Sequence, residues 1–277
     1  MVHIVLDSTA NVPSWLRQKR PNLHVVPLTV RIGTREMAED ELTAGELFTL
    51  IQRAGQHPQT SQPAPGEFVR LFGLLTAEGS QVIVITLSGG LSGTVESAKA
   101  AARIVGRPQL YVIDSGTTAA GMVTMAERAL AMADDGLAAE QIAEKLQAMA
   151  LATHTLFVPG TLEYLHKGGR IGGAAALAGS ILQIRPVLEL TAGKVVVLDK
   201  VRTRAKAVAR MTEEIFRLRE LDCISVVHIA AAEEAAQLQQ TIQRQYPGLQ
   251  VGLTEAGSVL ASHLGPGLVG VVFQELI

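Results

Sequence analysis

Short apolar runs alternate with longer amphipathic stretches over the first half of the chain. Four of these runs are rich in Val and Ile and end at polar residues or glycine, which predicts buried strands at residues 2–6, 25–32, 81–86 and 110–113. The stretches between and after them have helical patterns, with helices predicted at residues 13–19, 43–54, 65–77, 95–103, 117–133 and 138–152. Repeated strand–helix units of this kind predict a parallel sheet with helices on both faces.

The pattern changes near residue 153, after which a β-hairpin can be recognised. Residues 187–190 and 195–198 flank a turn that contains Gly193, and a hairpin makes its two strands antiparallel. Further strands are predicted at residues 155–158, 224–229, 250–253, 259–262 and 269–273, and helices at 161–167, 203–219 and 232–245. We therefore expect an α/β protein of two domains, with a mostly parallel sheet in residues 1–152 and a mixed sheet in residues 153–277.

Composition narrows the class of protein. Apolar residues make up 48% of the chain and aromatic residues only 4%, so Val, Ile, Leu and Ala must form most of the core. The 24 basic and 26 acidic residues nearly cancel, which argues against a nucleic-acid-binding surface. A single cysteine, Cys223, excludes an internal disulfide and a Cys-based metal site. No apolar run is long enough for a membrane span and the first residues resemble a strand, so a cytoplasmic protein is expected.

Residues 87–94 form the most unusual turn in the sequence. A predicted strand ends there, three glycines alternate with hydroxyl residues, and a predicted helix begins directly afterwards. In open α/β sheets, ligands bind beyond the carboxyl ends of the strands, and a helix N-terminus offers free N–H groups to an anion. The turn therefore predicts a site for a small anionic group.

Patterns typical of enzymes are incomplete. The order Ser92, Asp114, His263 matches the triad order of α/β-hydrolases, but Thr94 stands where Gly-x-Ser-x-Gly requires its last glycine. Residues 265–270 fit Gly-x-Gly-x-x-Gly, yet they precede a strand pattern, which argues against a dinucleotide site. The histidines lack metal-binding spacing, so no metal or cofactor is expected.

The candidate site residues offer hydroxyl and N–H groups as hydrogen-bond donors, without an evident nucleophile and general base. Such a site suits an anion that is bound and not changed chemically. Such an anion could be a carboxylate or a phosphate on an apolar body. The apolar stretch at residues 174–182 could contact that body, and a core helix is the alternative for this stretch.

Several short segments, taken in order, resemble the DegV family of bacterial fatty-acid-binding proteins. The resemblance covers essentially the whole chain, and it depends on the order and spacing of the segments because no single one is decisive. The segments are Asp7-Ser8-Thr9, Thr60-Ser61-Gln62-Pro63, Leu91-Ser92-Gly93-Thr94, Ile113-Asp114-Ser115, residues 162–171, Arg202 with Lys206-Ala207, and His263-Leu264-Gly265-Pro266-Gly267.

This resemblance implies a two-domain α/β protein that buries one long-chain fatty acid such as palmitate. The carboxylate is expected between the domains and the acyl tail in the C-terminal domain. The family pattern assigns the carboxylate-binding hydroxyls to Thr60 and Ser92, and His263 completes the hydrogen-bond network. Ser61, as the fallback for Thr60, and Gly93 are further candidates for the same site.

The resemblance also implies a partner and a role. Some family members present the fatty acid to a separate ATP-dependent kinase, which forms an acyl-phosphate for phospholipid synthesis. Arg170 and Arg202 are then expected near the mouth of the site, where they would contact the partner or the phosphate. A carrier without catalytic residues is the leading interpretation. The alternatives are a serine hydrolase or acyltransferase that uses Ser92, Asp114 and His263, and a structural or regulatory module with a vestigial pocket.

Overall fold

A computed structural model describes residues 1–77, 79–177 and 184–276. The strands are β1 Val2–Asp7, β2 Leu23–Val26, β3 Thr29–Ile32, β4 Arg35–Ala38, β5 Gln59–Ser61, β6 Gln81–Thr86, β7 Leu110–Asp114, β8 Thr153–Val158, β9 Arg185–Thr191, β10 Lys194–Val201, β11 Leu221–Ile229, β12 Val251–Glu255 and β13 Leu268–Glu275. The α-helices are α1 Ser14–Lys19, α2 Ala44–Ala54, α3 Pro65–Thr76, α4 Thr94–Val105, α5 Ala120–Asp134, α6 Ala139–Leu151, α7 Glu163–Lys167, α8 Arg204–Phe216, α9 Ala232–Gln245 and α10 Ser258–Leu264. Three short 3₁₀ helices are η1 Ser8–Ala10, η2 Glu39–Glu41 and η3 Gly172–Leu177.

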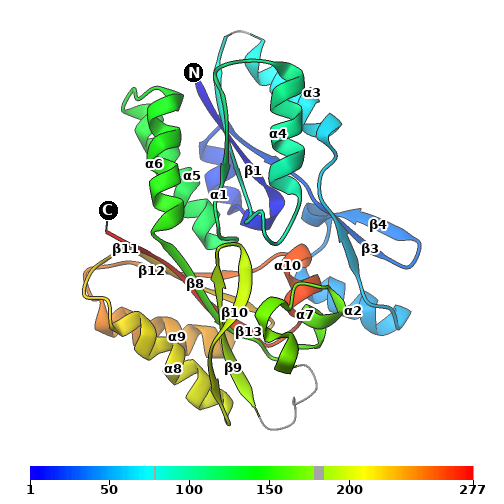
Figure 1. The fold of residues 1–277 in the computed structure, drawn as a ribbon, viewed down its shortest axis with the longest axis vertical. Coiled ribbons are helices and arrows are strands. Elements are labelled where there is room, and N and C mark those ends of the chain that lie inside the picture. The colour runs from blue at the N-terminus through cyan, green and yellow to red at the C-terminus, as the bar shows by residue number, and fades with distance from the viewer. Residues whose placement is uncertain (78, 178–183, 277) are drawn as a thin grey trace.

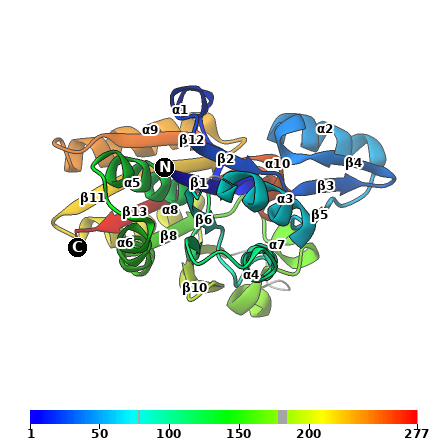
Figure 2. The same ribbon diagram turned by 90° about the horizontal axis from the view of Figure 1, so that it is seen from above.

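The first sheet is parallel and four-stranded, with the order β2-β1-β6-β7. Ile4 and Ile83 point to one face, where they pack with residues of α5 and α6. Val5 and Val84 point to the other face and pack against Phe68 of α3 and residues of α4. Figures 1 and 2 show these two helix pairs on opposite sides of the sheet. The predicted parallel sheet with helices on both faces is therefore confirmed.

The second main sheet is mixed and six-stranded, with the order β10-β9-β8-β13-β11-β12. Its pairs are antiparallel except for β11 with β12. One face packs against α8 and α9 through residues such as Met211 and Leu238. The other face carries Phe157, Leu188 and Val272, which join a different core cluster. The mixed sheet is confirmed, and its two faces have different neighbours.

A third sheet, β4-β3-β5, differs from the predicted single strand at residues 25–32. Pro27 has no N–H group to continue the ladder of β2, and the next N–H, from Leu28, is donated to the Ser8 hydroxyl at 2.9 Å. The chain therefore leaves the parallel sheet and starts a small antiparallel one. Residues 59–61, which lie outside the predicted strands and helices, form the strand β5 of this sheet.

The small sheet packs against elements that lie far away in sequence. Val30 and Leu47 belong to the same core cluster as Leu165 of α7 and Leu260 of α10. Figure 1 shows β3, β4 and α2 beside α7 and α10. Residues from the first half of the chain therefore contact the second half closely, and the division into domains 1–152 and 153–277 stays a prediction.

The predicted strand at residues 259–262 is wrong, because this segment lies in α10. A short apolar run gives the same signal for a buried strand and for a buried helix. Here Val259 to Ala261 are at most 6% exposed, and the helix is enclosed by the small sheet, α2 and α7. The apolar stretch 174–182 is described only up to Leu177, where it forms η3, and its remainder lies outside the described residues.

We expect Phe72→Ala to lower the free energy of unfolding by about 3–5 kcal/mol, because the ring is fully buried between α3 and the parallel sheet. The matched control is Leu74→Ala on the same helix. Leu74 is 76% exposed, so its loss is expected to stay within about 0.5 kcal/mol. Urea unfolding followed by circular dichroism measures both variants, and equal losses would contradict the inward face assigned to α3.

Candidate functional site

An apolar cavity of about 370 Å³ lies between the inner face of the six-stranded sheet, the small sheet and α10. This volume is within the range of small-molecule pockets in proteins. The cavity wall is mostly aliphatic and is contributed by residues far apart in sequence: Leu28, Leu87, Leu91, Ala119, Leu156, Phe157, Leu165, Leu190, Val195, Val227, Ala256, Val259, Leu260, Leu264, Leu268, Val271 and Val272. Such a wall suits an apolar ligand better than a polar one.

Polar side chains gather along part of this wall. They are Thr60, Ser61 and Gln62 from β5 and the residue after it, Ser92 from the turn before α4, Arg170 from the loop after α7, and His263 from α10. The structure therefore brings together five of the predicted site residues, namely Thr60, Ser61, Ser92, Arg170 and His263. Gly93 does not line this cavity, but it lines a second pocket beside it.

Thr60 and His263 form the central contact of this polar group. Thr60 Oγ1 lies 2.7 Å from His263 Nε2. Burial, together with the nearby Arg170 and His57, lowers the pKa of His263 to about 4, so the imidazole is neutral at physiological pH. Among the described residues, His263 Nδ1 has no hydrogen-bond partner.

Gly168 explains why that ring nitrogen is unpaired. A Cβ on Gly168 would lie 2.4 Å from His263 Nδ1, so the imidazole packs directly on the backbone at this position. The two glycines after α7 are visible in the sequence, but the contact they permit is not. Gly168 is therefore a site residue that the sequence analysis missed.

The turn before α4 holds Ser92 close to the backbone. Ser92 Oγ lies 2.9 Å from Thr94 Oγ1 and accepts a hydrogen bond from the Thr94 N–H at 3.3 Å. Gly93 leaves room for Gln62, whose Oε1 would lie 2.3 Å from a Cβ at that position. The turn thus touches the segment that carries Thr60, and both hydroxyls face the same cavity.

A second, more polar pocket lies outside the first one. Seven of its lining residues come from the two glycine-rich turns, namely Gly89 to Gly93 with Gly193 and Lys194, and Leu91, Ser92, Arg170 and Val195 line both pockets. Gly90 and Gly193 meet so closely that a Cβ on Gly90 would lie 2.0 Å from the carbonyl oxygen of Gly193. The exposed Arg170 donates to Leu91 O and Gly168 O, which holds its guanidinium at the border between the pockets.

Arg202 lies at the opposite end of the β9–β10 hairpin from this border. Lys194 pairs with Thr191 at the turn, and Val201 pairs with Arg185 at the open end. At a rise of about 3.3 Å per residue, Arg202 is roughly 25 Å from the turn that touches Gly90. It is exposed and is not among the described residues that line either pocket. The structure therefore does not bring Arg202 together with the other predicted site residues, and its expected contact with a partner or a phosphate stays a prediction.

The hydrogen bonds of a Ser–His–Asp triad do not form between Ser92, Asp114 and His263 within the described part of the chain. A triad needs the carboxylate on one ring nitrogen of the histidine and the serine on the other. Here the Asp114 carboxylate accepts from the N–H groups of Gly89 and Gly116, and His263 contacts Thr60. The catalytic arrangement proposed as an alternative is therefore not assembled.

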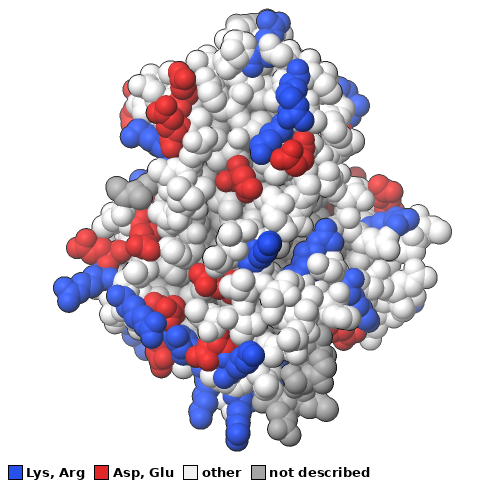
Figure 3. Space-filling view, viewed as in Figure 1, with Lys and Arg blue, Asp and Glu red and all other residues white. Residues whose placement is uncertain are grey.

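Other expectations concern metals, membranes and surface charge. No group of three or more His, Cys, Asp or Glu side chains suited to a metal occurs among residues 1–77, 79–177 and 184–276. Within the same ranges, no helix is both long and apolar enough to cross a membrane. Basic and acidic side chains of the described residues are interspersed on the face shown in Figure 3, consistent with the nearly balanced charge.

Together, the fold and the site define an α/β protein with an apolar pocket that has a neutral, hydrogen-bonding group on its wall. A family model described as "Uncharacterised protein, DegV family" matches residues 1–276. The chain belongs to the DegV family.

Relatives match over nearly their full length. A DegV domain-containing protein of Streptomyces coelicolor is 37% identical over 280 residues, which cover 99% of this chain and 98% of the relative. A solved DegV family structure from Thermus thermophilus, whose description mentions fatty acid binding, is 32% identical with a TM-score of 0.89 and 99% coverage of both chains. The structure of DegV from Bacillus subtilis, described as a fatty acid binding protein, is 30% identical with the same TM-score and coverage.

The neutral state of His263 can be tested by NMR. We expect the imidazole nitrogen signals of His263 to stay constant from pH 8 down to about 5.5 and to move only near pH 4, because burial disfavours the charged form. Assignment follows from the loss of these signals in His263→Gln. A titration of His263 centred above about pH 6 would show that the ring is solvated and would contradict this geometry.

Proposed function

We propose that this protein binds one long-chain fatty acid, with the carboxylate at Thr60, Ser92 and His263 and the acyl chain along the apolar wall. The observation that carries the proposal is the mostly aliphatic cavity whose wall includes the Thr60 and Ser92 hydroxyl groups and a neutral imidazole. Ser61 lines the same cavity, and Gly93 lines the second pocket beside it. The fatty acid binding named in the descriptions of the Thermus thermophilus and Bacillus subtilis relatives supports the same assignment.

The energetics suit such a ligand. Each buried methylene contributes about 0.8 kcal/mol, so a chain of about 16 carbons contributes on the order of 10 kcal/mol before the costs of ordering. The carboxylate loses its hydration when it enters, and it needs hydrogen-bond donors to stay ionised. Hydroxyl groups and backbone N–H groups provide donors without introducing a permanent charge into the cavity.

His263 determines the direction of these hydrogen bonds. Its Nδ1 atom has no partner among the described residues, so the tautomer with the proton on Nε2 leaves no donor unpaired. That proton is donated to Thr60 Oγ1, and the Thr60 hydroxyl proton is then free for the fatty-acid carboxylate. A neutral histidine therefore acts as a donor through Thr60, and the carboxylate stays unprotonated.

We also propose that the protein is a carrier that does not change its ligand chemically. The triad hydrogen bonds that a hydrolase requires are not formed among the described residues. Presentation of the carboxylate to a separate ATP-dependent kinase would need an opening beside Ser92. The outer pocket and the exposed Arg170 at its border provide a position for an incoming phosphoryl group or for the partner. Phospholipid synthesis would be the use of the acyl-phosphate.

The first test of the proposal removes one hydroxyl. Ser92→Ala should weaken the binding of palmitate or oleate roughly 10–100-fold, the effect of losing one hydrogen bond to a charged group. Isothermal titration calorimetry with delipidated protein measures the affinity. The control is Ser14→Ala, which removes an exposed hydroxyl on α1 and should leave the affinity unchanged. Equal affinities of the Ser92 variant and the wild type would overturn the assignment of the carboxylate site.

A second test separates a carrier from a hydrolase or acyltransferase. After incubation with p-nitrophenyl palmitate, intact-protein mass spectrometry should show no acyl adduct, and denaturing extraction of natively purified protein should release free fatty acid. A covalent acyl group on Ser92 would support the enzyme instead. Purified protein that contains no lipid and binds none would favour a module with a vestigial pocket.

A further inference from the structure

Glu39 is a buried carboxylate at the junction of three segments, and the sequence analysis did not single it out. It lies in η2 directly after the small sheet, and it is 5% exposed. Its Oε2 accepts a hydrogen bond from Ser8 Oγ at 2.5 Å, and its Oε1 accepts one from the Val259 N–H at 3.0 Å. Gly257 permits this approach, since a Cβ there would lie 2.5 Å from Glu39 Oε1.

One of these hydrogen bonds holds the helix that carries His263. Val259 is the second residue of α10, and His263 lies four residues further, on the same face of the helix. A helix of seven residues has little stability of its own, so its position depends on its neighbours. The Glu39 carboxylate fixes the position of the N-terminal end of α10. It thereby sets where His263 lies relative to Thr60 along the helix axis.

The other hydrogen bond holds the sheet that carries Thr60. Ser8 Oγ, while donating to Glu39, accepts from the Leu28 N–H, and Leu28 O accepts from the Glu39 N–H. Leu28 leads directly into β3, whose Val30 pairs with Thr60. The same carboxylate therefore connects the end of β1, the small sheet and α10, which together determine the separation of Thr60 and His263.

We propose that Glu39 is a positioning residue for the carboxylate site, which holds Thr60 and His263 in hydrogen-bonding register without touching the ligand. The proposal rests on the fatty-acid-binding function proposed above. Glu39 then influences the affinity for the ligand although its side chain is not among the described residues of the cavity wall. The affinity also depends on the protonation state of Glu39.

The surroundings of Glu39 place its titration near neutral pH. Burial, together with the charges of Asp7 and Asp40, raises the pKa of Glu39 to about 7, although the hydrogen bonds from Ser8 and Val259 lower it. Arg17 and Glu255 face the same region from α1 and β12, in a pocket that Glu39 also lines. Asp7, whose pKa burial raises to about 6, titrates in a neighbouring range.

Ligand binding and this proton are linked. A fatty-acid carboxylate near His263 brings a second negative charge to the far end of α10, which raises the pKa of Glu39 further. By reciprocity, affinity falls as pH rises through the range in which Glu39 ionises. A ligand-induced rise of about half to one pKa unit lowers the affinity about three- to tenfold between about pH 6 and 8.

The experiment measures palmitate affinity between about pH 6 and 8 for Glu39→Ala, Glu39→Gln and the wild type, together with thermal unfolding. Glu39→Ala should bind at least tenfold more weakly, because it leaves the Ser8 hydroxyl and the Val259 N–H unpaired. Glu39→Gln keeps an acceptor for Val259 and a partner for Ser8, so it should retain affinity within about threefold. The pH dependence of its affinity should also lack the contribution of Glu39, whereas the titration of the free ligand is the same for both proteins.

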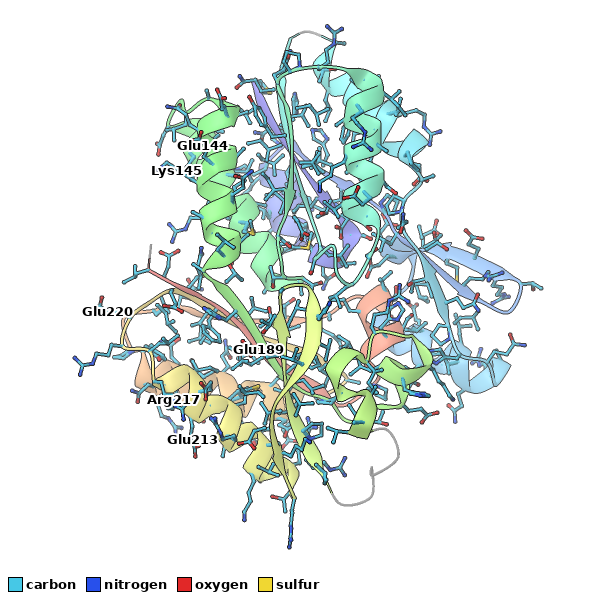
Figure 4. All side chains as sticks on the ribbon, in the orientation of Figure 1. Glu144, Lys145, Glu189, Glu213, Arg217 and Glu220 are labelled. Carbon is cyan, nitrogen blue, oxygen red and sulfur yellow. The ribbon has the colours of Figure 1, made fainter. Side chains whose placement is uncertain are left out.

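Two controls make the result specific. Glu144→Gln makes the same chemical change on the exposed surface of α6, away from the site, and should behave as wild type (Figure 4). Phe72→Ala destabilises the protein without touching the cavity, so it should keep its affinity at temperatures where it is folded. The comparison with Phe72→Ala separates an affinity loss caused by misplaced site residues from one caused by a less stable fold.

The outcomes distinguish the two proposals. Absence of binding by the wild type would refute the proposed function itself. Wild-type affinity in folded Glu39→Ala would refute the positioning role while leaving fatty-acid binding intact. An unchanged pH dependence in Glu39→Gln would refute the link to the proton.

Discussion

The contact between Thr60 and His263 places the strongest constraint on this structure. It joins side chains separated by 203 positions in the sequence, at a distance of 2.7 Å, beside an aliphatic cavity. Polar atoms in such surroundings are costly unless they are paired, so the elements that carry them must be held within a few tenths of an ångström. The small sheet, α10 and the loop after α7 are arranged to meet this requirement.

Glycines, which have no side chain, make this arrangement possible. Gly90 meets Gly193, Gly93 meets Gln62, and Gly168 meets the His263 ring, all at distances where a Cβ would collide. Each contact brings a loop from one sheet against a segment that belongs elsewhere. The glycines of the turn at residues 87–94 therefore serve close packing between segments, in addition to the freedom of the turn itself.

Much of the fold could be predicted from the sequence, because strands buried on both faces have continuous apolar runs and helices have a clear period. The small sheet could not, since its strands have only three or four residues and Pro27 interrupts what looks like one run. The helix α10 was mistaken for a strand for a related reason. A short segment enclosed on all sides has no polar face from which a period could be detected.

The site residues on the cavity wall were predicted through the family resemblance, and the structure brings most of them together. Among the described residues Arg202 lines neither pocket, because proximity in a motif does not reveal which end of a hairpin a residue occupies. Glu39 was missed because a buried carboxylate leaves no mark on the sequence pattern; its partners, Ser8 and Val259, lie 31 and 220 positions away.

The cavity lies inside a hydrophobic core cluster whose residues come from both halves of the chain, including Leu28 and Val272. A bound hydrocarbon would therefore form part of the protein core. The empty form lacks the dispersion contacts that an acyl chain would supply, and its folded population is correspondingly smaller. In a cell, unliganded molecules would unfold more often and be removed faster by proteases. With the fatty acid proposed above as the ligand, the lifetime of this protein would follow the supply of that fatty acid, and a shortage would also reduce the amount of the protein.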